Sequence, residues 1–147
     1  MSIRKEITTR IITELKLING QVSSFDSSYT YNSNLFGNVD RGFKFFDSIN
    51  DFPSVYIVAG RETRTYNSQE FTEAGLPITL RIYHKSSDVQ NELQNVIDDI
   101  EHVIYNLTDS PILGIEDITI DAISTDEGLL EPYGFGEIIL SVQYVLS

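Results

Sequence analysis

Residues 118–144 read ITIDAISTDEGLLEPYGFGEIILSVQY, in which two runs of alternating apolar and polar residues flank an acidic turn. Before the turn, Ile118, Ile120 and Ala122 alternate with polar residues. After it, apolar side chains recur at every second position, at Ile138, Leu140, Val142 and Tyr144. A period of two is that of a strand with one buried face, so this stretch predicts two strands joined by the turn.

The turn between these runs is rich in acids and glycines. Asp126, Glu127 and Glu131 are carboxylates of the kind that can hold a hard cation such as calcium. Their spacing matches no established calcium loop, so we expect solvated turn residues or partners for basic groups on another chain. Gly134 and Gly136 lack the spacing of a phosphate-binding loop, and we expect them to supply backbone angles for the turn.

Two more strands are expected upstream. Val55 to Ala59 form a nearly continuous apolar run, which suits a strand in the middle of a sheet or covered on both faces. The other strand alternates, with apolar side chains at Leu76, Ile78, Leu80 and Ile82. Between the two, residues 60–75 are polar apart from a few aromatics, a pattern that indicates a strand leaving the body of the protein. We therefore expect an extended hairpin with a projecting arm at about residues 60–75.

Amphipathic helices are predicted in two places. Near the N-terminus, apolar residues recur at helical spacing from Ile3 to Ile18, and Asn19 and Gly20 are expected to end that helix. The second helix is expected to begin at a capping box that joins Ser87 to Gln90. Its apolar stripe consists of Val89, Leu93, Val96, Ile97, Ile100, Val103, Ile104 and Leu107. The opposite, polar face is predicted to carry Asp98, Asp99, Glu101 and His102, and the helix is expected to stop at residues 109–111.

Residues 21–41 are rich in Ser, Asn and Tyr and predict a long loop or a weak hairpin. Loops of this length in a compact domain are more often functional or disordered than inert. The aromatic and apolar residues of the segment are too many for a flexible linker: Phe25, Tyr29, Tyr31, Leu35 and Phe36. We expect the segment to pack on its own domain, with packing on a neighbouring subunit as the alternative.

Taken in chain order, these elements predict a single α+β domain over residues 1–147. The expected architecture is a mostly antiparallel sheet of about four strands, with two amphipathic helices packed on one face. The length of 147 residues is that of about one domain.

Composition excludes several classes of function. Cysteine is absent, which rules out disulfides and thiolate chemistry, and the formal charge of −12 disfavours nonspecific binding to nucleic acid. No apolar run approaches the length of about 20 residues that a membrane-spanning helix needs. The N-terminus lacks the pattern of a signal peptide, so we expect a protein made and kept in a cytosol.

No catalytic, cofactor or metal site is expected. A Ser-His-Asp site would have to use His84 or His102, and neither is placed for it in the sequence. A metal-dependent nuclease could use Asp117, Asp121 and Glu137, but no Lys or Arg follows Lys85 to hold phosphate. We therefore expect a protein that is not an enzyme, with a small metal-dependent hydrolase as the remote alternative.

Three stretches together resemble the tail terminator and tail completion proteins of tailed bacteriophages. They are FPSVYIVAGRE at residues 52–62, LRIY at residues 80–83 and DEGLLEPYG at residues 126–134. The resemblance covers most of the chain, but residues 21–41 carry little of it. It implies a structural virion protein that forms a hexameric ring on the head-proximal end of the tail tube, stops tail polymerisation and provides the surface for head joining.

The resemblance also implies partners and a location. The partners are further copies of the chain in the ring, the tail tube protein, the tail sheath protein as a further candidate, and neck or connector proteins. DNA would pass through the lumen without specific binding, no membrane would be involved, and assembly would take place in the host cytoplasm. A neck or head-completion protein of the same fold is the alternative reading. The polar arm and the acidic turn are the expected subunit or tube interface, at Arg61, Glu62, Arg64, Tyr66, Asp126, Glu127, Glu131 and Tyr133.

Overall fold

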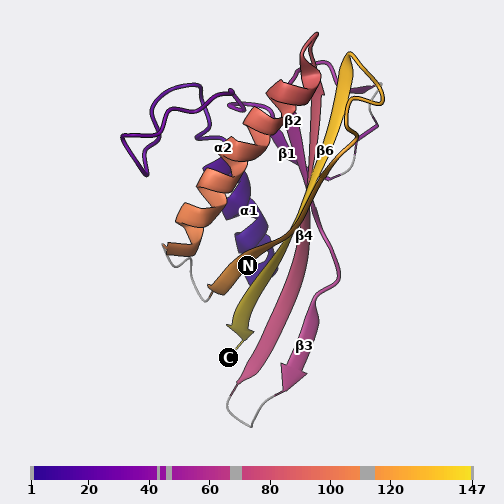
Figure 1. Ribbon diagram of the computed structural model, residues 1–147. Coiled ribbons are helices and arrows are strands. Elements are labelled where there is room, and N and C mark those ends of the chain that lie inside the picture. The colour runs from indigo at the N-terminus through magenta and orange to yellow at the C-terminus, as the bar shows by residue number, and fades with distance from the viewer. Residues whose placement is uncertain (1, 43, 46–47, 67–70, 110–114, 147) are drawn as a thin grey trace.

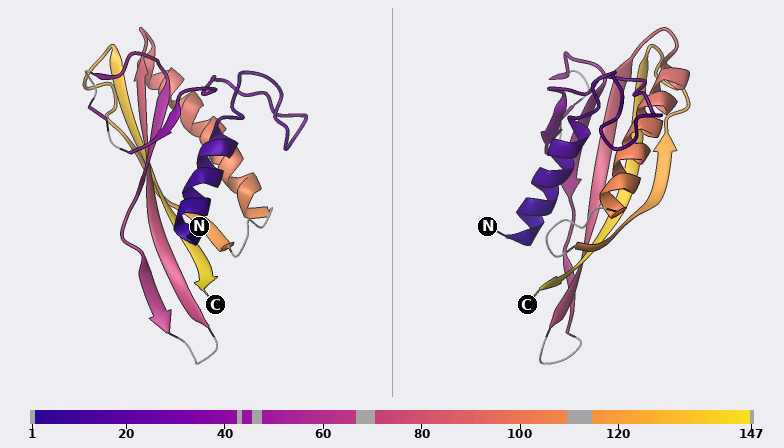
Figure 2. Two further views of the ribbon diagram at one scale, coloured as in Figure 1. Left: turned by 180° about the vertical axis from the view of Figure 1, so that it is seen from behind. Right: turned by 90° about the vertical axis from the view of Figure 1, so that its left-hand side faces the viewer.

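The structure, a computed structural model, describes residues 2–42, 44–45, 48–66, 71–109 and 115–146. In chain order the elements are α1 (Ile3–Leu15), β1 (Val39–Arg41), β2 (Ser54–Ala59), β3 (Thr63–Tyr66), β4 (Thr72–Lys85), α2 (Val89–Asp109), β5 (Ile115–Thr125) and β6 (Tyr133–Leu146). Among these residues the strands form one sheet in the order β1-β2-β4-β6-β5, and β3 pairs with β4. Both helices lie on the same face of the sheet (Figure 1, Figure 2). The predicted α+β class, with two helices on one face, is confirmed.

The sheet has six strands, so the expected number of four was wrong. The count left out β1, which pairs in parallel with β2, and β3, which pairs antiparallel with β4. β3 lies within residues 60–75, where the sequence did predict a strand. β1 has three residues and lies inside the segment predicted as a loop, where it is too short to show a period of two. The side chains of β3 are all exposed, which agrees with the polar pattern from which a strand was predicted in residues 60–75.

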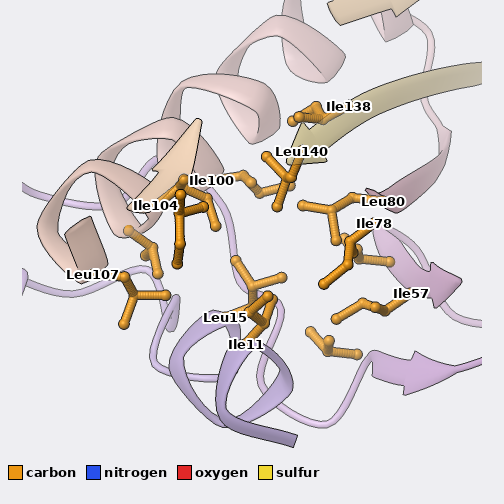
Figure 3. Packing of buried hydrophobic residues seen from close by; sticks show 14 of the residues in the cluster. Ile11, Leu15, Ile57, Ile78, Leu80, Ile100, Ile104, Leu107, Ile138 and Leu140 are labelled. Atoms are coloured by element: carbon orange, nitrogen blue, oxygen red, sulfur yellow. The ribbon is translucent and has the colours of Figure 1, made fainter. Parts of the chain in front are cut away.

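The core lies between the sheet and the helices (Figure 3). β4 and β6 pair along their whole length, from Thr72 opposite Leu146 to Lys85 opposite Tyr133. The alternating apolar residues of Leu76–Ile82 in β4 and Ile138–Tyr144 in β6 are all buried, which confirms these two predicted strand faces. The face predicted for residues 118–122 is wrong in part: Ile118 is buried, but Ile120 is half-buried and Ala122 is exposed, because the pairing of β5 with β6 shifts register between Ile120 and Ala122. The apolar stripe predicted for α2 is buried as well, from Val89 to Leu107. The apolar side chains that alternate along β4 and β6 thus pack against the apolar stripe of α2 in one hydrophobic core.

The helix ends differ in detail from the prediction. α1 ends at Leu15 rather than at Asn19, although Ile18 remains buried in the core. The carbonyl of Ile18 accepts a hydrogen bond from the Leu35 amide at 2.7 Å. α2 begins at Val89, close to the predicted start, but the capping box is wrong. The amide side chain of Gln90 does not turn back towards the helix end, because it donates to the carbonyl of Glu127. α2 ends at Asp109; residues 110 and 111 of the predicted stop lie outside the described residues.

Gly134 and Gly136 do not supply turn angles, contrary to expectation. Both are buried residues of β6, and a Cβ built on Gly134 would lie 2.4 Å from a methyl carbon of Val89. Glycine is therefore required at position 134 because the first turn of α2 packs directly on the backbone of β6. The left-handed conformations of the turn belong to Glu127, with φ 52°, and Gly128, with φ 78°.

The segment of residues 21–41 packs on its own domain, as predicted. Its anchor is Asp99 of α2, which was expected on the solvated face of the helix but is 0% exposed. Asp99 accepts hydrogen bonds from Tyr29, Asn32 and Ser33 of the segment. His102, also predicted as solvated, is half-buried: its ring stacks on Tyr29 at 4.0 Å between centroids. A polar cluster on the flank of α2 therefore holds the segment in place.

Candidate functional site

The predicted interface residues fall into two groups at opposite ends of the sheet. Arg61, Glu62, Arg64 and Tyr66 lie beside the end of β4 that begins at Thr72, whereas Asp126, Glu127, Glu131 and Tyr133 lie beside its other end, at Lys85. β4 has 14 residues, so at about 3.3 Å per residue the two groups are on the order of 40 Å apart. They form two surfaces rather than one site (Figure 1). We call them the arm surface and the turn surface.

The arm surface begins at a bulge between β2 and β3. Ala59 lies opposite Ile78 and Thr63 lies opposite Gly75, so four steps along one strand match three along the other. Gly60 occupies the bulge, where its amide donates to the Pro77 carbonyl at 2.8 Å. Past the bulge, β3 and the start of β4 extend beyond both helices (Figure 1).

Glu62 links the arm surface to the core. Its side chain is 9% exposed, and its carboxylate accepts hydrogen bonds from the Tyr144 hydroxyl and, at 2.9 Å, from Nε of Arg64. Burial by itself raises the pKa of Glu62, but the hydrogen bonds from Tyr144 and Arg64, together with the charge of Arg4, outweigh burial and lower the pKa. Burial, and then the Glu62 carboxylate, raise the pKa of Tyr144. Glu62 is therefore partly a structural residue, because it satisfies the hydroxyl of a fully buried tyrosine.

The remaining residues of the arm surface face solvent. Arg61 and Thr65 are exposed, half of the Arg64 side chain is exposed, and Tyr66 is 76% exposed. A large aromatic ring in that position has no role in the core, and aromatic and arginine side chains are enriched in protein interfaces. Residues 67–70 of the predicted arm lie outside the described residues.

The turn surface is held in place by α2 and presents apolar and acidic side chains together. The Asp126 amide donates to the Phe135 carbonyl at 3.0 Å, which closes the turn. Leu129 is 83% exposed and Leu130 is exposed too, between the exposed carboxylates of Glu127 and Glu131. The Lys85 ammonium lies 5.2 Å from the ring centre of Tyr133. Asp126 differs from its neighbours because it is half-buried, and its carboxylate accepts a hydrogen bond from the Gly128 amide at 3.4 Å.

The two histidines have polar partners that sequence spacing did not reveal. Nε2 of His102 lies 2.7 Å from the Ser23 hydroxyl, across 79 residues of sequence. Nε2 of His84 lies 3.1 Å from Glu92, which also accepts a hydrogen bond from the Ser86 hydroxyl. The carboxylate of Glu92 thus lies between the Ser86 hydroxyl and the His84 imidazole. In a Ser-His-Asp site the imidazole lies in the middle, so this is not such a site. Both histidines therefore join α2 to neighbouring segments.

The described residues also bear on metal binding and membranes. Among them, no group of three or more His, Asp or Glu side chains is placed to hold a metal ion. No helix within the described ranges is both long and apolar enough to span a bilayer.

Comparison with known proteins defines the family. The family described as Bacteriophage Tail Tube Terminator Protein matches residues 1–147. A curated relative, the tail tube terminator protein p142 of Escherichia phage T5, is 38% identical over 128 residues, which are 78% of this chain and 78% of the relative. The chain belongs to the tail tube terminator family. The expected class, a structural protein of the phage tail that terminates the tail tube, is confirmed by this membership.

A solved structure shares the fold of this terminator at much lower sequence identity. A chain in the virion of a native gene transfer agent particle superimposes with a TM-score of 0.52 and 5% identity, over 76% of this chain and 81% of that chain. At that identity the likeness concerns the fold alone. It extends over most of the terminator and supports the α+β architecture described above.

Proposed function

We propose that this terminator assembles into a hexameric ring on the head-proximal end of the tail tube, stops tube polymerisation there, and offers the surface to which the filled head joins. The observation that carries the proposal is the match of the terminator family to the whole chain. A ring of this kind acts by occupying the surface that the next ring of tube subunits would need.

The open sheet supports assembly into a ring. In the described structure β5 pairs only with β6, and β1 pairs only with β2, so the sheet has two edges that a neighbour can cover. These two edges differ in sequence and shape. Contacts between unlike surfaces repeat around a closed ring, whereas contacts between like surfaces end at a dimer.

We place the contacts with other virion proteins at the two ends of the sheet. The arm surface, at Arg61, Arg64 and Tyr66, is proposed to contact the tail tube protein or the next subunit of the ring. The turn surface, at Glu127, Leu129, Glu131 and Tyr133, is proposed to contact neck or connector proteins, or the sheath protein where the tail has one. The separation of the two surfaces supports this division, because a cap must bind two partners on opposite sides.

The charge of the chain suits a passage for DNA. The net charge is −12, and a wall of like charge keeps the duplex from adhering. We propose that DNA passes through the lumen without specific binding and that the terminator has a structural rather than a catalytic role.

The test is an infection in which the gene of the terminator is inactivated, compared with wild type by negative-stain micrographs of both lysates. Filled heads without tails, together with tubes longer than wild type, are expected. Tails of normal length that fail to join heads would contradict termination and favour a neck protein. Normal infectious particles would contradict both roles.

A further inference from the structure

The charges of this chain are divided along its sequence. All ten Lys and Arg residues lie within residues 4–85, whereas residues 86–147 carry thirteen of the 22 Asp and Glu residues and no Lys or Arg. The first segment, with ten cations and nine acids, is therefore nearly neutral, and the whole net negative charge of the chain lies in the second.

The fold turns this division into two edges of unlike charge. α1, β1, β2 and β3 come from the first segment and lie on one side of β4, while β6 and β5 come from the second segment and lie on the other side. α1 packs over β1 and β2, and α2 packs over β6, β4 and β5 (Figure 2). The side with α1, β1 and β2 thus carries cations as well as acids, whereas α2, β5 and β6 carry acids and no Lys or Arg. Two further cations, Arg81 and Lys85, lie on β4 between the two sides, and Arg81 lies 4.0 Å from Glu137 of β6.

The cationic edge consists of Lys5, Lys16 and Arg41. The guanidinium of Arg41 on β1 donates to the Thr9 hydroxyl on α1 at 3.3 Å, which joins the helix to the edge strand. Lys5 and Lys16 lie on the same side of α1 as Thr9, because positions four and seven residues apart share a helix face. Lys5 and Arg41 are exposed.

The anionic edge consists of Asp98 and Glu101 on α2 and Asp117 on β5. Asp98 and Asp117 are exposed, and no ion pair among the described residues includes any of the three carboxylates. Burial, and then the charge of Asp98, raise the pKa of Glu101, as expected where carboxylates crowd without a counter-charge. Exposed apolar side chains accompany them: Tyr105 on α2 and Ile123 on β5. Apolar groups with unpaired charges around them are typical of a surface that another protein covers.

We propose that the anionic edge of one copy of the terminator binds the cationic edge of the next copy, so that the ring closes head to tail by charge complementarity. The inference rests on the proposed ring and names the surfaces that form it. A two-fold contact through either edge would place like charges against one another, which disfavours a symmetric dimer. The contact is therefore weakened by salt and has a direction around the ring.

Charge reversal tests the contact. Variant A carries Asp98→Lys and Asp117→Lys, so both of its edges are basic; variant B carries Lys5→Glu and Arg41→Glu, so both of its edges are acidic. Two differently tagged copies of each variant are expressed during infection with the gene of the terminator inactivated. Because like charges at an interface cost several kcal/mol, we expect each variant alone to lower both copurification of the tagged copies and infectious titre by at least about a hundredfold.

Mixing the variants provides the decisive comparison. A and B expressed together should recover both readouts, because subunits that alternate in a six-membered ring place opposite charges at every contact. A chain with all four substitutions should recover as well. Asp51→Lys is the control: it reverses an exposed acid that belongs to neither edge and should copurify like wild type.

The outcomes separate this inference from the proposed function. Undiminished copurification of A alone or B alone, failure of the mixture to recover, or absence of copurification for wild type would overturn the inference. If A and B behave as expected while the infection without any terminator still yields tails of normal length, the contact stands and the proposed function falls. If wild type is captured by a basic partner other than the chain itself and variant A is not, a second copy is not the occupant of the anionic edge.

Discussion

The Asp99 carboxylate accepts two hydrogen bonds from Ser33, one from the backbone N–H at 2.8 Å and one from the hydroxyl at 2.6 Å. The Asn32 amide donates to the same carboxylate at 3.0 Å, and the Tyr29 hydroxyl donates at 2.9 Å. The side-chain amide of Asn32 donates as well, at 3.2 Å, so five donors from one loop converge on one buried acid of α2. No cation takes part, so the charge is stabilised by oriented amide and hydroxyl dipoles.

Asp99→Ala should therefore destabilise the subunit by on the order of 3 kcal/mol, because it leaves buried backbone donors without an acceptor. Asp98→Ala, on the exposed side of the same helix turn, should change the free energy of unfolding by less than about 0.5 kcal/mol. Urea unfolding of both variants at neutral pH makes the comparison. Equal effects would show that the loop does not depend on Asp99.

Leu140→Ala should cost about 2 to 5 kcal/mol, because the Leu140 side chain is fully buried at the centre of β6. Gln143→Ala, at an exposed position of the same strand, is the matched control and should cost less than about 0.5 kcal/mol. The free energy of unfolding in urea is the measurement. Little change for Leu140→Ala would remove the C-terminal strand from the core.

Gly134→Ala should destabilise the subunit by about 1 to 3 kcal/mol, since the new methyl group would overlap the Val89 side chain. Gly75→Ala is the control, because the added methyl would meet Thr63 at an ordinary contact distance of 3.5 Å. Val89→Ala combined with Gly134→Ala should recover part of the loss. If the double variant loses as much stability as the two single variants added together, the clash with Val89 is not the reason why Gly134→Ala destabilises the subunit.

The link between Glu62 and Tyr144 should make stability depend on pH. Because the pKa of Glu62 is lower in the folded state than its ordinary value of 4.5, its contribution is present above pH 4.5 and is lost as the pH falls through the folded-state pKa. Glu62→Gln should therefore be less stable than wild type at pH 7, and the difference should shrink at pH 3. Urea unfolding at both values tests this, with Glu131→Gln in the exposed turn as the control. A difference that does not change with pH would contradict the lowered pKa.

Substitutions on the arm surface should separate assembly from folding. Arg61→Glu alters an exposed side chain and should change the free energy of unfolding by less than about 0.5 kcal/mol, while it weakens binding to tail tubes purified from a lysate without terminator. Arg64→Glu should weaken binding too, but it should also lower stability, because it places a second carboxylate beside Glu62. A large fall in melting temperature for Arg61→Glu would show that the arm is structural.

Much of the architecture follows from local patterns. Leu76 to Ile82 and Ile138 to Tyr144 show the period of a strand, and Val89 to Leu107 show the period of a helix; each pattern predicted the buried face correctly. These predictions hold because one continuous core covers all three segments. Strand β1 escaped prediction because it is only three residues long, whereas β3 lies where the polar pattern of residues 60–75 predicted a strand.

The sequence was enough to single out the residues of the arm surface and the turn surface as candidates. It did not show which buried residues of the domain their side chains contact. The arm and the acidic turn were recognised by polarity, charge and turn residues. That Glu62 satisfies a buried tyrosine 82 residues away depends on the pairing of β3, β4 and β6. Ser23 and His102 are likewise brought together only when the loop packs on α2.

By itself, the sequence determined the fold class, the buried faces of α2, β4 and β6, the family, and the confinement of cations to residues 4–85. Only the tertiary structure decided that Asp99 is buried, that position 134 excludes a side chain, and that Arg41 on β1 and Asp117 on β5 lie at opposite edges of the sheet. The physical reason is the range of the interactions. The periodicity of apolar residues reflects burial of side chains that are close in sequence. The hydrogen bonds to Asp99, the contact of Val89 with Gly134 and the charge of an edge depend instead on residues that only the folded chain brings together.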